Sequence, residues 1–298
     1  MAEESLRARI ATLAAAEPAL AEGLALRGAM LEILDHAPVS LPELRLPADL
    51  VRARLAAGVP LLDGLELPAT AEGSSLFQRL TVAMLADPDA RQPAETILRA
   101  LERHRLHAEQ LIGEAVVGHQ DHLVALADGA EGSSALVETL ADLAARPLLA
   151  QVARRLQPAL ALSAWTRSYC PICGARPIRA EGTQQAAGAA SLRCGRCTTS
   201  WAWTLPGCPS CQQGQLSPHG TWEIAGAGRW TLLGCERCLV YLKSVDSPHS
   251  EELAALLVDD LASWPLDRAA LEAGLGRADG PGRRLEHGDP AGEDLDDD

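Results

Sequence analysis

The 298-residue chain is long enough for one large domain and a smaller one, because domains usually run to about 100 to 200 residues. Its 40 acidic residues outnumber its 26 basic ones, and the resulting formal charge of -14 argues against a protein that wraps nucleic acid through clustered Lys and Arg. No apolar run reaches the roughly 20 residues that cross a bilayer, and the acidic first residues lack the pattern of an export signal, so we expect a cytoplasmic protein without membrane insertion.

Residues 1–164 predict an all-α N-terminal domain. This stretch contains no Cys and is rich in Ala, Leu, Glu and Arg, which favour helices. Apolar residues recur at helical spacing, as Leu6, Ile10 and Leu13 do near its start. We expect about seven helices.

Prolines and Gly-Ser clusters indicate where these helices end. Residues 58–60 and 71–75 are typical of loops. Pro147 falls within the last long helical pattern and predicts either a kink or a helix that restarts there. The other expected helix ends lie at Pro38, Pro42, Pro47, Pro60, Pro68, Pro88 and Pro93.

From residue 165 to 248 the composition changes, and the segment holds all eight Cys, five of the six Trp and both Tyr. The cysteines form four Cys-x-x-Cys pairs, namely Cys170 and Cys173, Cys194 and Cys197, Cys208 and Cys211, and Cys235 and Cys238. Two intervening residues allow both sulfurs of a pair to reach one ion from a tight turn, and two such turns complete a tetrahedral site. Because the cytoplasm is reducing, we expect two bound metal ions and no disulfides.

The spacing between the pairs predicts how they combine. Twenty residues separate the first two pairs and twenty-three the last two, which suits hairpins, whereas the gap of ten in the middle suits a connection. We therefore expect two small rubredoxin-like or zinc-ribbon β modules, at residues 165–206 and 207–248, with one four-cysteine site each. Crossed pairing between the modules is the alternative.

Four thiolates suit both iron and zinc, so the ligands leave the metal open. In one interpretation both sites are closed and purely structural. In the alternative, at least one site changes redox state or loses its metal as part of its role. Gly174 directly follows the first pair and eases a positive φ, whereas the equivalent residues Thr198, Gln212 and Leu239 are less suited to it.

The remaining polar and aromatic residues of the chain give weaker signals. Five aromatic residues of the cysteine region are expected to cover the metal sites: Trp201, Trp203, Trp222, Trp230 and Tyr241. Alternatively, they stack on nucleic-acid bases or anchor a protein partner. His104, His107, His119 and His122 are expected to face solvent, and Asp121 beside them makes no convincing site. No phosphate loop, nucleophile elbow or catalytic cysteine–histidine spacing is present, so we expect no enzymatic activity.

Residues 249–275 predict a C-terminal amphipathic helix or helix pair that ends at Gly274 and Gly276. Residues 276–298 contain three Arg against eight acidic residues and no apolar pattern, which predicts an acidic, disordered tail.

Several motifs taken in order resemble the formate dehydrogenase accessory protein family, the FdhE type. They are CPICGARP at 170–177, LRCGRC at 192–197 with Trp201 beyond it, CPSC at 208–211, and CERCLVYLK at 235–243. DDLAS at 259–263 and GVPLL at 58–62 are similar to further segments of that family.

The resemblance implies a helical domain followed by two rubredoxin-like modules, with iron associated with the cysteines. It implies a non-catalytic cytoplasmic factor that binds the catalytic subunit of formate dehydrogenase and is required for its activation or maturation. The partner-binding residues and the oligomeric state are left open. Two alternatives are a zinc-ribbon protein that binds nucleic acid or the transcription machinery, and a thiol redox enzyme, which would expose one reactive cysteine pair.

Overall fold

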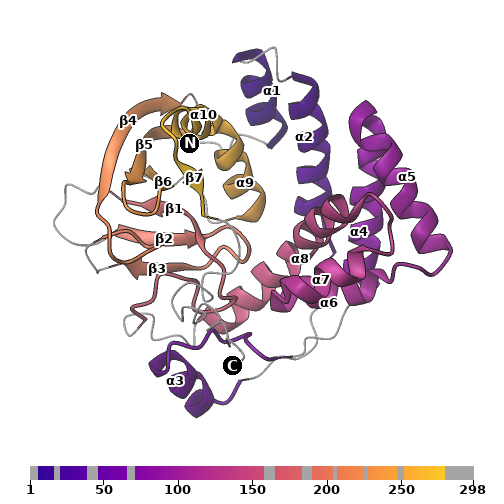
Figure 1. The fold of residues 1–298 in the computed structure, drawn as a ribbon, viewed down its shortest axis with the longest axis horizontal. Helices are drawn as coiled ribbons and strands as arrows, with labels where there is room; N and C mark the ends of the chain where they lie inside the picture. The colour runs from indigo at the N-terminus through magenta and orange to yellow at the C-terminus, as the bar shows by residue number, and fades with distance from the viewer. Residues whose placement is uncertain are drawn as a thin grey trace, which may run out of the picture.

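A helical half and a strand-rich half lie side by side in the computed structural model of the protein (Figure 1). The structure describes residues 6–16, 21–38, 46–65, 71–157, 165–182, 190–203, 207–224, 227–246 and 252–278. The predicted order, helices first, then strands carrying the cysteines and then C-terminal helices, is confirmed.

Eight α-helices and one 3₁₀ turn occupy the described residues up to 157, close to the seven helices predicted. They are α1 (Leu6–Ala16), α2 (Ala21–Asp35), α3 (Ala48–Ala56), α4 (Ala71–Ala83), η2 (Met84–Ala86), α5 (Pro88–Glu102), α6 (Ala108–Val117), α7 (Gln120–Ala127) and α8 (Ser134–Leu156). The longest, α8, packs against α2, α4, α5, α6 and α7, so it forms the centre of the helical half.

Two predictions about helix ends are wrong. The expected loop at 71–75 is the first turn of α4, because Leu76, Phe77 and Leu80 form a buried face whose packing outweighs the weak helix propensity of the Gly and Ser before them. Pro93 lies inside α5, whereas Pro88 begins that helix with Asp87 as its N-cap. Helix α8 continues through Pro147 without restarting.

Seven strands form one sheet in the order β3-β2-β1-β6-β5-β4, with β7 beside β6. Their bounds are β1 (Pro177–Glu181), β2 (Ala190–Cys194), β3 (Ser200–Trp203), β4 (Leu216–Ile224), β5 (Gly228–Cys235), β6 (Val240–Val245) and β7 (Gly276–Arg277). The first two cysteine pairs lie before β1 and at the turn from β2 to β3, and the last two lie before β4 and at the turn from β5 to β6. Parallel pairing of β1 with β6 joins the two sets of strands into one sheet.

The C-terminal region forms a helix pair, α9 (Leu253–Ala262) followed by α10 (Trp264–Glu272). The sequence had predicted either one helix or a pair here. Helix α9 packs against α1, α2 and α8, and α10 packs against β5. Gly276 and Arg277, placed by the sequence at the start of the disordered tail, instead pair with Val240 and Tyr241 of β6. Residues 279–298 of that tail lie outside the described residues.

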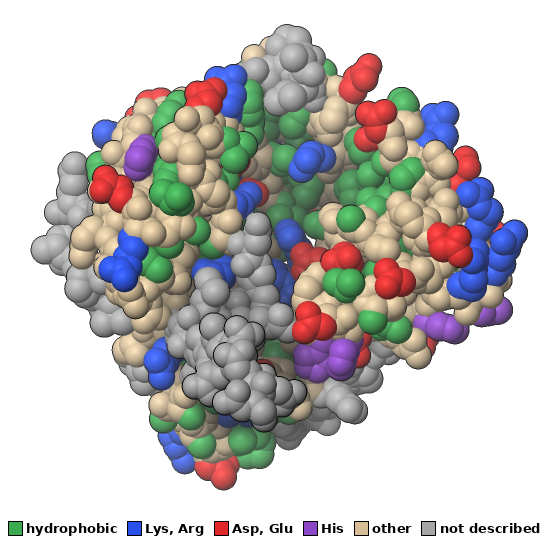
Figure 2. Space-filling model, in the orientation of Figure 1, with side chains coloured by type: hydrophobic (Ala, Val, Ile, Leu, Met, Phe, Trp, Pro, Cys, Tyr) green, Lys and Arg blue, Asp and Glu red, His purple; other side chains and the backbone are tan. Residues whose placement is uncertain are grey.

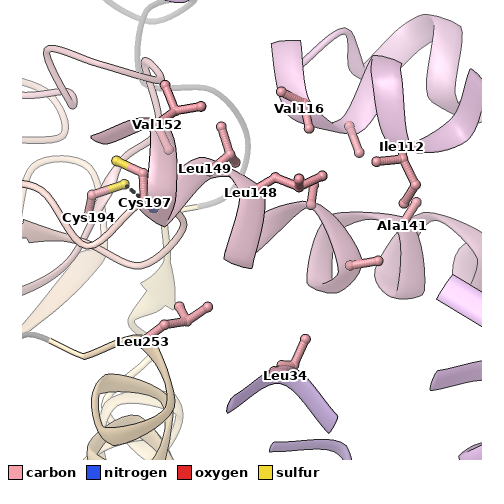
Figure 3. Close-up of a cluster of buried hydrophobic side chains, with 14 of the residues drawn as sticks. Leu34, Ile112, Val116, Ala141, Leu148, Leu149, Val152, Cys194, Cys197 and Leu253 are labelled. Atoms are coloured by element: carbon pink, nitrogen blue, oxygen red, sulfur yellow. Dashed lines mark hydrogen bonds between the residues drawn. The ribbon is translucent and has the colours of Figure 1, made fainter. Parts of the chain in front are cut away.

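The main hydrophobic core extends from the helices into the first cysteine module. Three of its buried members are Cys170, Cys194 and Cys197, which pack with the helical leucines. Figure 3 shows Cys194 and Cys197 beside Leu149 and Val152 of α8. A smaller second core, which includes Trp230 and Tyr241, lies between the sheet and α10. The first module therefore shares its core with the helical half. No helix among the described residues is long and apolar enough to span a bilayer.

Candidate metal centres

The eight cysteines gather into two groups of four, in the sequential pairing predicted. Cys170, Cys173, Cys194 and Cys197 form the first group, and Cys208, Cys211, Cys235 and Cys238 form the second. None of the eight forms a disulfide. Crossed pairing is excluded because the ligand atoms within each group lie within 4.8 Å of one another.

The distances between sulfur atoms fit tetrahedral metal sites. In the first group the Cys170–Cys197 and Cys173–Cys194 sulfurs lie 3.4 and 3.5 Å apart. In the second group the Cys208–Cys238 and Cys211–Cys235 sulfurs lie 3.8 Å apart in both cases. A tetrahedron with metal–sulfur bonds of about 2.3 Å places its sulfurs about 3.8 Å apart. These separations far exceed a disulfide bond of about 2.05 Å.

The same backbone turn recurs at all four cysteine pairs. The residue after each pair has a positive φ: 73° at Gly174, 62° at Thr198, 56° at Gln212 and 56° at Leu239. In every case its N–H donates to the carbonyl of the first cysteine of the pair, over 2.8 to 3.2 Å. The three non-glycine residues thus adopt the same left-handed conformation as Gly174, even though it is unfavourable for them.

Backbone N–H groups point at the sulfurs from inside these turns. Ile172 donates to Cys170 over 3.4 Å, and Arg196 donates to Cys194 over the same distance. In the second group Ser210 donates to Cys208 over 3.3 Å. Such donors stabilise thiolate charge, so the turns are suited to metal-bound sulfur.

Sequence reasoning missed two residues that support the groups. The hydroxyl of Thr199 lies 3.1 Å from the sulfur of Cys197. Gly214 donates its N–H to Cys211 over 3.3 Å, and a Cβ at this position would lie 2.4 Å from the Cys235 sulfur. This close approach to the sulfur requires glycine at position 214. In the sequence, the only signal for this requirement is that Gly214 lies three residues after Cys211.

The GVPLL segment packs across the first cysteine pair. The N–H groups of Leu61 and Leu62 donate to the carbonyls of Pro171 and Ile172, each over 2.9 Å. Both leucine side chains are fully buried. The hydroxyl of Tyr169 donates to the carbonyl of Gly58 over 2.6 Å. A loop from the helical half therefore holds the turn of the first cysteine pair in place.

Arg196, within the second cysteine pair, connects the first group to α6 and α8. Its Nε donates to Asp142 over 2.7 Å, and its Nη2 donates to the carbonyl of Ala115. Arg146 also binds Asp142, at 2.8 Å. Burial opposes the charged carboxylate, but the two guanidinium groups overcome this effect and hold the pKa of Asp142 at about 2.

A mostly buried chain of ion pairs connects the first cysteine group to helices near the two ends of the chain. Arg193 donates to the carbonyl of Thr198 over 2.9 Å and binds Glu181 at 2.7 Å. Glu181 also binds Arg179 at 2.9 Å, and Arg179 binds Asp259 of α9 at 2.8 Å. Arg9 of α1 completes the chain at Asp259.

Most basic residues of the sheet are thus neutralised inside the protein. Lys243 is buried and binds Asp260 at 2.6 Å and Asp267 at 3.0 Å. Arg179, Arg193 and the partly buried Arg196 likewise lie within ion pairs. Arg237 is exposed, and so is Arg229, which approaches Glu223 and Asp246 on the surface. This arrangement offers little positive surface for phosphate groups.

The two cysteine groups differ in their exposure. Only Cys173 is partly exposed in the first group, whereas Cys211 and Cys238 are partly exposed in the second. Burial raises the pKa of Cys170 well above its usual range, so the thiolate there needs a cation beside it. Burial also opposes charge at Cys211, but the N–H groups of Gln213 and Gly214 and the neighbouring thiols lower its pKa to about 7.

Three of the five aromatic residues predicted to cover the metal sites are buried, and two, Trp201 and Trp203, pack in or against the core that contains cysteines. Trp201 lies in the main core with the first group and donates to the carbonyl of Arg167 over 3.1 Å. Trp230 and Tyr241 belong to the second core, which contains no cysteine among the described residues. Trp203 and Trp222 are half-buried.

The four histidines are exposed as expected, but two of them are not isolated. His119 and His122 both approach Glu114, while His104 and His107 lie elsewhere on the surface. Asp121 lines the neighbouring cleft.

This cleft, of about 1510 Å³, lies between the two halves of the molecule, beside the first cysteine group. Its walls come from α2, α6, α7, α8 and α9, and Cys173, Gly174 and Arg196 contribute from the cysteine turns. Seven acidic residues line it against three arginines, a balance of 3 - 7 = -4. Figure 2 shows a hollow in this face, with acidic side chains along one rim, histidines beyond them, and basic and hydrophobic side chains at its other edges.

Comparison with known proteins supports the fold. No family model and no curated protein matches the sequence. Among solved structures, the chain is similar to the crystal structure of the FdhE protein from Pseudomonas aeruginosa, with 23% identity, coverage of 90% of each chain and a TM-score of 0.54. The predicted resemblance to the FdhE type is therefore confirmed as a likeness of fold.

Proposed function

We propose that each cysteine group binds one metal ion, iron or zinc, through its four thiolates. The sulfur spacings, the N–H donors and the repeated turns support this assignment. Iron is expected from the resemblance to the FdhE type, whereas the ligand geometry accommodates both metals equally.

The chain, in this proposal, is a cytoplasmic accessory factor without enzymatic activity. It binds the catalytic subunit of formate dehydrogenase and is required for the activation or maturation of that subunit. The observation that carries the proposal is the FdhE-like fold over 90% of the chain, together with two four-cysteine groups. A thiol redox enzyme is disfavoured, because each group places four cysteines around one point and exposes no isolated pair.

The cleft is the proposed contact surface for the client. Both halves of the molecule line it, and it reaches the first cysteine group at Cys173. Its excess of carboxylates favours a positively charged segment of the client. Binding there would allow the metal centre and the client to influence each other.

Deletion of the gene in its own host tests the role. We expect formate oxidation to be lost while formate dehydrogenase transcripts remain, and we expect the tagged chain to co-purify with the catalytic subunit. A Cys173→Ser, Cys211→Ser double variant should fail to restore activity, whereas an Arg229→Ala variant on the exposed surface should restore it.

Normal formate oxidation in the deletion strain would contradict the accessory role. If the purified chain then bound nucleic acid with an affinity that fell steeply with salt, the zinc-ribbon alternative would replace it. The exposed Arg229 and Arg237 are the residues to substitute in that test, since the buried Arg193 and the partly buried Arg196 lie in ion pairs and their loss would disturb the fold.

A further inference from the structure

A third group of metal-ligating side chains lies outside the cysteine region, at the turn between α6 and α7. It consists of Glu114, His119 and His122, whose ligand atoms lie within 4.8 Å of one another. Nothing in the sequence pattern had separated these histidines from other exposed ones.

The turn itself brings the three residues together. Helix α6 ends at Val117 and is capped by Gly118, whose φ of 78° reverses the chain. The N–H groups of Gly118 and His119 both donate to the carbonyl of Glu114, over 3.0 and 3.1 Å. Helix α7 then begins at Gln120, so His119 and His122, three positions apart, lie on the same side of its first turn.

The two imidazoles converge on one carboxylate oxygen. The Nδ1 atom of His119 lies 3.0 Å from Oε2 of Glu114, and the Nδ1 atom of His122 lies 3.4 Å from the same oxygen. The rings meet edge to face, with their centroids 5.5 Å apart. Two imidazole nitrogens and one carboxylate oxygen thus surround one small volume.

We infer that Glu114, His119 and His122 form an open binding site for a divalent first-row transition metal ion. Imidazole with carboxylate suits ions such as Zn²⁺, Ni²⁺, Co²⁺ and Fe²⁺, and three protein ligands leave coordination positions for water or another group. The absence of thiolates distinguishes this site from both cysteine groups.

The surroundings indicate an accessible site and not a structural one. The side chains of Glu114, His119 and His122 are 29%, 50% and 73% exposed, so an ion can enter and leave without unfolding the turn. Glu114 and His119 also line the acidic cleft that Cys173 lines. An ion bound here would lie on the wall of the same cleft as the first cysteine group.

The competing interpretation is that the three residues form only a hydrogen-bonded cluster that joins α6 to α7. This interpretation predicts that substitutions lower stability without changing metal binding. The two interpretations therefore differ in metal stoichiometry and not only in stability.

Titration of the full-length protein with Ni²⁺ at pH 7.5, after both cysteine groups have been loaded with zinc, tests the inference. We expect one further equivalent of Ni²⁺ in the wild-type chain and its loss in a His119→Ala, His122→Ala double variant. Glu114→Gln keeps the shape of the side chain and should weaken binding at least about tenfold. A His104→Ala, His107→Ala double variant is the matched control and should bind as the wild type does.

The paramagnetic ion also reports its own position. Ni²⁺ should broaden the ring proton signals of His119 and His122 before those of His104 and His107 in NMR spectra. If no further equivalent binds up to millimolar Ni²⁺, or if the equivalent persists in the His119→Ala, His122→Ala variant, the site does not exist. The outcome does not depend on formate dehydrogenase or on the proposed function.

Discussion

At the scale of single residues, the turn at each of the four cysteine pairs requires a positive φ at the residue after the pair. Only the first turn has glycine at that position. The sequence predicted the two groups of four cysteines, since the spacing within and between the pairs can be read from the sequence. It did not predict that Thr198, Gln212 and Leu239 would all adopt positive φ, because their intrinsic preference opposes it. The hydrogen bonds of the turn and the gathering of four sulfurs outweigh that preference.

Replacing Leu239 with glycine should stabilise the second module. Its φ of 56° is unfavourable for leucine, and its side chain is 56% exposed, so little packing is lost. We expect the free energy of unfolding to rise by roughly 1 kcal/mol. Thermal unfolding of the metal-loaded variant measures it. Leu271→Gly, at an exposed helical position, should destabilise instead.

Single cysteine substitutions should separate the two sites. Cys173→Ser and Cys211→Ser are each expected to lose about one metal ion, because a four-cysteine site without one thiolate is left open. Cys173→Ser should cost more stability, since the first group shares its core with the helices while the second group does not. Metal content and thermal unfolding measure both effects. If one substitution removed both ions, the sites would not be independent.

At the scale of elements, contacts between distant segments decide what sequence patterns leave open. The helical half and the strand-rich half were predictable from composition and periodicity. The parallel pairing of β1 with β6 was not, because no local signal identifies partners that lie more than sixty residues apart. The first turn of α4 was also missed, since burial of Phe77 and Leu80 against neighbouring helices decided its structure.

Asp142→Asn should weaken the attachment of the first cysteine module to α8. The variant leaves the guanidinium groups of Arg196 and Arg146 without their shared carboxylate. Because the pKa of Asp142 is lowered to about 2 from its ordinary value near 4, its ion pairs contribute roughly 2 kcal/mol above pH 4.

The stabilisation by Asp142 should depend on pH in one direction only. A carboxylate with a lowered pKa loses its contribution only as pH falls from about 4 to about 2. Denaturant unfolding should therefore show the same difference between wild type and Asp142→Asn throughout pH 6 to 8. A difference that vanished between pH 8 and 6 would show that another group carries the effect.

At the scale of the whole molecule, the two halves enclose an acidic cleft that neither forms alone. The sequence showed the overall negative charge but gave no indication that carboxylates from α6, α7, α8 and α9 would face one hollow. Only the packing of α8 and α9 against the first module creates that arrangement.

Glu138→Lys should weaken capture of the client if the cleft is the contact surface. Glu138 lines the cleft and accepts a hydrogen bond from Gln120 over 2.8 Å. We expect the amount of co-purified catalytic subunit to fall at least about tenfold, which corresponds to about 1.4 kcal/mol. Glu131→Lys makes the same charge change at a side chain that is 85% exposed and outside the cleft lining, and should capture the client normally. Equal losses in both variants would indicate a long-range charge effect and not contact in the cleft.

The ion pair between Arg9 and Asp259 has a consequence for how the protein is made. These residues are 250 positions apart, so the first helix leaves the ribosome long before its carboxylate partner is synthesised. The ion pair of Arg179 also cannot form until Asp259 has been synthesised, and β1 cannot pair with β6 until β6 has been synthesised. All four ligands of the first cysteine group are already present by residue 197. The nascent chain can therefore gather its first four cysteines early, but the last step of folding must wait until α9 packs against α1 and β1 from the C-terminal end of the chain.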